Sequence, residues 1–161
     1  MDKNYEIYGH FHTKKSVLIS NKDSTKWRNF LLKNLVGYDG SCMADKILTE
    51  MVKDKTLGLV FPEDQYCVGW GSNYKRAVEL SKKIGITRIP RNLNFPVGNM
   101  FWVRSGALKT LYELNLSWDD YPLEPIGYDG TILHAIERLL PIIAESNGYN
   151  YRMTYVSGVS R

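Results

Sequence analysis

Apolar and polar positions alternate along the chain in patterns that predict both strands and helices. Residues 5–11 are expected to form a short strand that runs into a polar loop. Residues 57–62 form an apolar run closed by Pro62, which is typical of a buried strand, and residues 149–156 alternate as a final strand should. The segment NLNFPVGNMFWV at 92–103 predicts either one strand or two broken pieces.

Five further segments have apolar residues at helical spacing. They are residues 24–36, 43–54, 74–85, 105–114 and 129–149. Asp23 or Ser24 can cap the first helix, while Ser105 is expected to cap the fourth and Asp129 the last. Pro141 removes one hydrogen bond from the last helix, so a kink or a break is expected there. Strand and helix patterns that alternate in this way predict an α/β domain.

Length and composition fit one globular domain over residues 1–161. Hydrophobic residues make up 43% of the chain and charged residues 24%, so a packed core is expected. The two cysteines, Cys42 and Cys67, form no disulfide framework, which suits a reducing cytoplasm. The N-terminus has no apolar run typical of a signal peptide, and no segment has the apolar length of a membrane span.

The net charge of +4 makes anionic partners plausible, but the charges are scattered. No basic run exceeds a Lys-Lys pair, and aromatic and basic residues do not interleave as on a nucleic-acid-binding sheet. A nucleic-acid partner is therefore not expected. No Walker loop, GxGxxG, HExxH or GxSxG motif occurs, which disfavours NTPases, Rossmann dehydrogenases, zinc peptidases and α/β-hydrolases.

An acidic loop offers the first candidate for chemistry. Asp119, Asp120, Glu124 and Asp129 lie within eleven positions on a loop that ends where a helix starts. Like charges and partial burial raise a carboxyl pKa, so such a group can act as a general base for a hydroxyl. The alternative is that Asp129 only caps its helix and the others are solvated.

Three other segments carry polar side chains suited to a ligand. His12, Lys14 and Lys15 in HTKKS could hold a diphosphate, or the loop could simply be solvated. The segment WGSN at 70–73 offers backbone amides to an anion, or forms an ordinary turn and cap. His134 and Glu137, one helical turn apart and next to Arg138, are interpreted as structural rather than catalytic.

The order of several segments resembles one known family. HTKKS, WRNFLLKNLVG, LGLVFPED, WGSN, FPVGNMFWVRSGAL and DGTILHAIERLLPIIAESNGY together resemble the rhamnan synthesis protein F family of bacterial polysaccharide glycosyltransferases. Their succession over nearly the whole chain is the specific part, since no single segment is a signature of a chemistry. The resemblance implies transfer of a sugar, for example rhamnose, from a nucleotide-sugar donor in cell-surface rhamnan or lipopolysaccharide synthesis.

The resemblance also implies a fold and partners. The fold would be of the nucleotide-diphospho-sugar transferase type, with a mostly parallel sheet flanked by helices. The chain would correspond to the C-terminal, acceptor-side part of a GT-A-type glycosyltransferase, so an N-terminal half or another subunit is an expected partner. A glycan or lipid-linked acceptor implies a cytoplasmic protein that attaches peripherally at the inner face of the cell membrane.

Site residues follow from the same resemblance. The catalytic base would be Asp129 first and Asp120 second. Donor phosphates would be bound by His12, Lys14, Lys15 and Arg104. The sugar or acceptor would be bound by Gly98, Asn99, Trp102, Trp118 and Glu124.

Two questions stay open from the sequence. Related folds commonly carry an Asp-x-Asp pair that binds Mg²⁺ or Mn²⁺, and His10-Phe11-His12 stands in the corresponding place here. Either the histidines hold a metal, or Lys14 and Lys15 neutralise the diphosphate; we favour the lysines because they need no further ligand. The other class of function is a non-catalytic carbohydrate-binding or scaffold module with the same fold.

Overall fold

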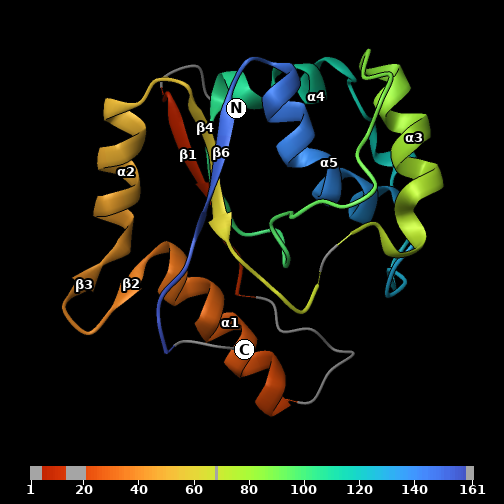
Figure 1. Cartoon of the computed structure of the whole chain (residues 1–161). Helices are drawn as coiled ribbons and strands as arrows, with labels where there is room; N and C mark the ends of the chain where they lie inside the picture. Colours follow the sequence, from red (N-terminus) through yellow and green to blue (C-terminus); the bar gives the residue numbers. More distant parts are fainter. Residues whose placement is uncertain (1–4, 14–20, 68, 159–161) are drawn as a thin grey trace.

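A computed structural model describes residues 5–13, 21–67 and 69–158 (Figure 1). Its centre is a four-stranded sheet in the order β1-β5-β4-β6. The strands are β1 Ile7–His10, β4 Leu57–Pro62, β5 Phe101–Arg104 and β6 Asn150–Thr154. A separate hairpin pairs β2 Gly37–Tyr38 with β3 Ser41–Cys42.

The sheet is mixed, so the expectation of a mostly parallel sheet is wrong, although the α/β class is confirmed. β5 runs antiparallel to both β1 and β4, and only β4 and β6 are parallel. The reason is the connection between β4 and β5. The chain leaves the carboxyl end of β4, passes through a helix and returns along residues 84–100 to the same end of the sheet, where β5 begins.

Five α-helices and three short 3₁₀ helices flank the described strands. The α-helices are α1 Asn21–Leu35, α2 Met43–Lys53, α3 Tyr74–Lys83, α4 Lys109–Glu113 and α5 Ile132–Ser146. The 3₁₀ helices are η1 Gly71–Asn73, η2 Ser105–Leu108 and η3 Trp118–Asp120. In Figure 1, α1 and α2 lie on one side of the sheet and α3, α4 and α5 on the other.

Two apolar clusters fill the spaces on the two faces of the sheet. In β4, Leu59 and Phe61 contribute to the cluster beneath α3 and α5, whereas Leu57 and Val60 contribute to the cluster beneath α1 and α2. β5 divides in the same way, with Val103 on the first side and Trp102 on the second. From Leu59 to Phe61 the side chains alternate between the two faces, and a register irregularity between Leu57 and Leu59 places Leu57 on the face opposite to Leu59. Because both faces of the sheet are covered, β4 is buried along its whole length.

The start of α5 differs from the expectation. Its N-cap is Thr131, whose hydroxyl accepts a hydrogen bond from the backbone N–H of His134 at 3.5 Å, and not Asp129. Asp129 is engaged with another helix, as described below. The predicted break at Pro141 does not occur, because α5 continues through this residue and its buried face lies in the core, which outweighs one lost hydrogen bond.

The region around residues 92–114 is also less regular than its pattern predicts. Only Phe101–Arg104 forms a strand, and the turn before it is not part of the sheet. The helix expected from Ser105 is a 3₁₀ turn followed by the short α4, and Ser105 is its first residue rather than its cap. Within the described residues, none of the helices combines the length and apolar character needed to span a bilayer.

Candidate functional site

Polar side chains gather at the end of the sheet where β1 finishes and β5 begins, close to the start of α5. We call this group the polar cluster. Its members are His10, His12, Gly98, Asn99, Asp129, His134, Glu137 and Arg138, with Ser72 and Asn73 at the start of α3. These residues come from four separate segments, so the cluster is a product of the tertiary fold.

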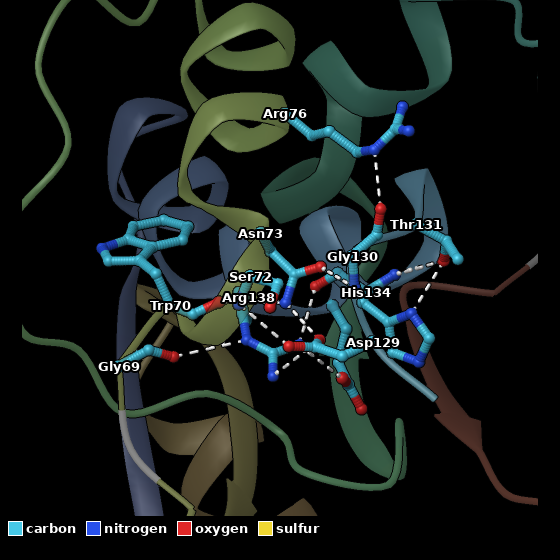
Figure 2. A network of polar contacts seen from close by, with 11 residues as sticks. Gly69, Trp70, Ser72, Asn73, Arg76, Asp129, Gly130, Thr131, His134 and Arg138 are labelled. Atoms are coloured by element: carbon cyan, nitrogen blue, oxygen red, sulfur yellow. Dashed lines mark hydrogen bonds and ion pairs between the residues drawn. The ribbon is translucent and has the colours of Figure 1, made fainter. Parts of the chain in front are cut away.

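Asp129 binds the N-terminal end of α3 (Figure 2). One carboxylate oxygen accepts a hydrogen bond from the backbone N–H of Ser72 at 2.9 Å, and the other accepts from the side-chain amide of Asn73. The Asn73 side chain in turn accepts from the N–H of Gly130 at 3.0 Å. The backbone amide of Ser72 and the side-chain amide of Asn73 therefore bind an anion, and that anion is the protein's own carboxylate.

Arg138 joins Asp129 to the core of the cluster. Its side chain is buried, and its guanidinium lies 3.4 Å from the Asp129 carboxylate and 3.5 Å from that of Glu137. It also donates hydrogen bonds to the carbonyls of Gly69 at 3.3 Å and His134 at 3.1 Å. A buried cation with two carboxylate partners fixes the relative position of α5 and the acidic loop.

The environment of Asp129 makes it a weak base. Burial acts to raise the pKa of its carboxyl, but hydrogen bonds from Ser72 and Asn73 and the charge of Arg138 outweigh burial and hold the pKa below its ordinary value. The carboxylate is therefore ionised at neutral pH, and its oxygens are already bound. This arrangement suits a residue that positions α3 and Arg138 better than one that accepts a proton.

Glu137 has the opposite electrostatic character. Only 14% of its side chain is exposed, and burial raises the pKa of its carboxyl to about 7. The charge of Arg138 and the backbone amides of Gly98 and Asn99 act against this shift without cancelling it. Glu137 can therefore hold or release a proton near neutral pH.

The turn before β5 lies between Glu137 and two histidines. Gly98 and Asn99 both adopt positive φ, at 80° and 54°. While their amides face Glu137, their carbonyls accept hydrogen bonds from His12 Nε2 and His10 Nδ1, each at 2.6 Å. The turn is thus held from both sides by ionisable side chains.

Packing explains why the turn carries a glycine. A Cβ at Gly98 would lie 2.9 Å from Leu31 Cδ1 and 3.1 Å from the Trp27 ring, closer than such contacts normally allow. The positive φ adds to this restriction. The turn is therefore pressed against α1 on one side while it presents backbone amides and carbonyls on the other.

With this geometry established, the chain can be compared with known proteins. The family described as Rhamnan synthesis protein F matches residues 1–149. The chain belongs to this family. The resemblance inferred from the order of segments is thus confirmed, and membership links the chain to rhamnan or other polysaccharide synthesis in bacteria.

Two curated relatives of this family member carry the name uncharacterized protein WxcX. The chain is 30% identical over 152 residues to the uncharacterized protein WxcX of Xanthomonas campestris pv. campestris strain B100, and equally to WxcX of strain ATCC 33913. The match covers 92% of this chain and 21% of each relative, so the chain spans about a fifth of the length of the curated relatives it matches. No solved structure matches the chain significantly.

His10 and His12 do not by themselves fit a metal site. Each uses one ring nitrogen to donate to a carbonyl of the 98–99 turn, and their ring centroids lie 6.5 Å apart. His10 also stacks on Phe101 with ring centroids 5.1 Å apart. Among the residues that the structure describes, no group of three His, Cys, Asp or Glu side chains could hold a metal ion.

The third histidine, His134, lies in the first turn of α5, just after the acidic loop. His134 Nδ1 is 2.7 Å from the hydroxyl of Thr131. Burial lowers the pKa of His134, the Asp129 carboxylate acts to raise it, and Arg138 lowers it further. His134 is therefore predominantly neutral at neutral pH and hydrogen-bonded to the cap of its own helix.

Arg104, predicted to bind phosphate, lies in the interior instead. It is 3% exposed, forms an ion pair with Glu6, and donates to the backbone carbonyls of Met51 and, at 3.4 Å, Leu57. A guanidinium with three protein partners ties α2 and β4 to the N-terminal strand. This placement offers no surface to a ligand.

Asp120 lies apart from Asp129, so the two predicted acids do not form a pair. It accepts hydrogen bonds from the N–H of Ser117 at 2.8 Å and from the Ser117 hydroxyl at 3.0 Å, which lower its pKa. Its electrostatic neighbour is Lys83 at the end of α3, whereas Asp129 binds the start of the same helix. Because α3 has ten residues and is therefore about 15 Å long, the two aspartates lie near opposite ends of it.

The other predicted sugar-binding residues lie apart from the polar cluster, two on the surface and one beneath a helix. Trp118 is 92% exposed, and Glu124 is exposed on the same loop. Trp102 donates to the carbonyl of Leu35 at 2.9 Å and packs beneath α1. Lys14 and Lys15 lie outside the described residues. Among the described members of the predicted set, Gly98, Asn99, His12 and Asp129 belong to the polar cluster.

Sequence reasoning assigned Glu137 a structural role and did not place it in the site. The available signal was its position, one helical turn after His134 and adjacent to Arg138. That spacing indicates a shared helix face, but it does not indicate that the face meets the 98–99 turn.

Proposed function

We propose that the chain is a glycosyltransferase domain that transfers a sugar, such as rhamnose, from a nucleotide-sugar donor during cell-surface polysaccharide synthesis. Family membership supports the pathway, since the family is described by rhamnan synthesis. The observation that carries the chemistry is a nearly buried glutamate, Glu137, with a pKa of about 7 beside a tightly packed glycine turn. A base is most effective when its pKa lies near the working pH.

In this proposal Glu137 takes the role first assigned to Asp129. It removes the proton from an acceptor hydroxyl, and the oxygen then attacks the anomeric carbon of the donor. The bond between that carbon and the diphosphate breaks, and the electron pair leaves with the diphosphate. Asp129 keeps Arg138 beside Glu137, so that Arg138 stabilises the carboxylate before it takes the proton.

The polar cluster also suggests how an acceptor would be oriented. The amides and carbonyls of Gly98 and Asn99 are close to ionisable side chains and can exchange these partners for sugar hydroxyls. Removing water from such a site strengthens each of these hydrogen bonds. The acceptor would be a glycan or lipid-linked glycan, and the protein would work in the cytoplasm at the inner face of the membrane.

The test is a transfer assay on the purified chain with a panel of nucleotide-sugars and a glycan acceptor. Release of nucleoside diphosphate is measured for the wild type, Glu137→Gln and the matched control Glu145→Gln, which changes an exposed glutamate on the same helix. We expect Glu137→Gln to lose roughly 100-fold or more in rate and the control to stay near the wild type. Full activity in Glu137→Gln would rule out this residue as the base.

A second outcome would favour the non-catalytic module. If the wild-type chain bound glycan but released no nucleoside diphosphate with any donor, the function would be carbohydrate binding. Asp129 supports this alternative. Both of its carboxylate oxygens are already hydrogen-bonded and the group is ionised, which suits a structural role rather than a catalytic one.

A further inference from the structure

A pocket outside the polar cluster lies along α3. It has a volume of about 440 Å³, within the range of small-molecule sites. Tyr74, Val78 and Ser81 line it from α3, and Arg88, Ile89 and Arg91 line it from the segment that follows the helix. We call it the α3 pocket. The helix residues are spaced by one turn, so they form one continuous wall.

Positive charge is concentrated in the segment of chain that forms this pocket. Residues 71–91 contain six lysine and arginine residues and one glutamate, which leaves 15 basic and 16 acidic residues in the rest of the chain. The excess charge of the protein therefore belongs to this one segment. Such a local excess attracts anions far more effectively than the same charge spread over the surface.

Not all of these cations are available to a ligand. Arg76 donates to the carbonyl of Gly130 at 2.7 Å, and Lys83 interacts electrostatically with Asp120. Arg88 and Arg91 are exposed, and in the described part of the chain their guanidinium groups have neither a hydrogen bond nor an ion pair. The acidic residue of the segment, Glu79, does not line the pocket.

The segment that carries the two arginines is held in place. Trp70 Nε1 donates to the carbonyl of Pro90 at 2.7 Å, and the N–H of Gly69 donates to Leu93 at 3.1 Å. Ile89 packs against the core beneath α3. The backbone between the arginines is thus fixed, which lowers the entropy lost when the guanidinium groups bind a ligand.

We propose that the α3 pocket binds the diphosphate group of a small ligand, with Arg88 and Arg91 as its cationic contacts. Two guanidinium groups three residues apart can each offer paired N–H donors to neighbouring phosphates. The half-exposed ring of Tyr74, supported edge-on by Trp70 at 5.9 Å between ring centroids, provides an apolar wall for the rest of the ligand. Both nucleoside diphosphates and isoprenyl diphosphates have this chemistry.

The inference is independent of catalysis, because it concerns binding and needs neither an acceptor nor Glu137. It also differs from the phosphate site expected at His12 and Arg104, since neither of these two residues lines the pocket. Trp70 and Tyr74 adjoin Ser72 and Asn73, so the α3 pocket and the polar cluster meet at the start of α3.

Isothermal titration calorimetry of the purified chain tests the proposal. Inorganic pyrophosphate, uridine diphosphate and geranyl diphosphate are titrated into the wild type, Arg88→Gln/Arg91→Gln and the control Lys26→Gln/Lys46→Gln. The control removes the same charge from exposed positions on α1 and α2. Because the two arginines are exposed and no described residue bonds to them, their variant is expected to fold, which thermal unfolding verifies.

We expect the arginine variant to bind diphosphates roughly 100-fold more weakly than the wild type, and the control to bind unchanged. Tighter binding of uridine diphosphate than of geranyl diphosphate would assign the pocket to a nucleotide, and the reverse order would assign it to a lipid carrier. Absence of binding in the wild type, or equal weakening in both variants, would overturn the proposal. Failure of the transfer assay alone would leave it standing.

Discussion

Replacing Glu137 by glutamine should change how the stability of the protein depends on pH. Its carboxyl has an ordinary pKa of 4.5, and burial raises this to about 7 in the folded chain. Between these two values the folded protein holds a proton that the unfolded chain has released. The contribution of Glu137 to the free energy of unfolding therefore falls as pH rises from about 4.5 to 7, and stays constant above that range.

The magnitude follows from the size of the shift. Each pKa unit corresponds to about 1.4 kcal/mol, so the raised pKa of Glu137 costs the folded state about 3 kcal/mol once the carboxyl is ionised. Its side chain is only 14% exposed, so little of this is screened by solvent. Between pH 5 and pH 8 the loss that comes from Glu137 should be about 2 to 3 kcal/mol.

Two neighbouring groups also affect the curve. Asp129 has a lowered pKa, so its contribution is complete above the acidic range and does not change between pH 5 and pH 8. Burial lowers the pKa of His134, so its contribution to stability is lost as pH falls below 6.5 and acts in the opposite direction to Glu137. Both groups remain in Glu137→Gln, so the difference between variant and wild type isolates Glu137.

The assay is urea unfolding of the wild type, Glu137→Gln and Glu145→Gln at pH 5 and pH 8. Relative to wild type, Glu137→Gln should gain about 2 to 3 kcal/mol between the two pH values, and Glu145→Gln should gain almost nothing. If the gain were the same for both variants, Glu137 would titrate like an exposed glutamate. The argument for a base near neutral pH would then fail.

Three further substitutions test the packing of the site by chemical unfolding at pH 7. Gly98→Ala should destabilise the protein by at least about 1 kcal/mol more than Gly40→Ala, because both glycines have φ of 80° but only Gly98 lacks space for a Cβ; equal losses would show that the turn can move away from α1. Asp129→Asn should cost about 2 kcal/mol because it leaves the buried Arg138 less well paired, and an unchanged midpoint would contradict the role of Asp129 as its anchor. Arg104→Met should cost about 2 kcal/mol yet leave diphosphate affinity unchanged in calorimetry, whereas a loss of affinity would restore the predicted phosphate role.

The positions of the main elements could be predicted from periodicity, but the pairing of the strands could not. LGLVFP is buried along its length as its composition indicates, and the helix at 74–85 ends close to its expected glycine. The orientation of β5 depends on residues 84–100, which return the chain to the end of the sheet where β4 finishes. A loop without periodicity holds no local signal for its direction.

Only those features of the candidate site that lie within a single segment of the sequence could be predicted. The glycine turn at 98–99 and the helix start at 70–73 were both visible in the sequence. Asp129 looked like a cap because it precedes a helix, but its hydrogen-bond partners lie in η1, just before α3 and more than 50 residues earlier. The pKa of Glu137 depends on burial that the 98–99 turn helps to provide, and helix spacing alone does not reveal this.

The contacts of Asp129 connect the two parts of the functional argument. The start of α3 carries a partial positive charge that would attract a phosphate, but the Asp129 carboxylate already neutralises it. A diphosphate that reaches this corner of the molecule must therefore be bound by other cations. Arg88 and Arg91 are exposed, line the α3 pocket and have no bonded partner among the described residues, so they are the cations best placed to bind it.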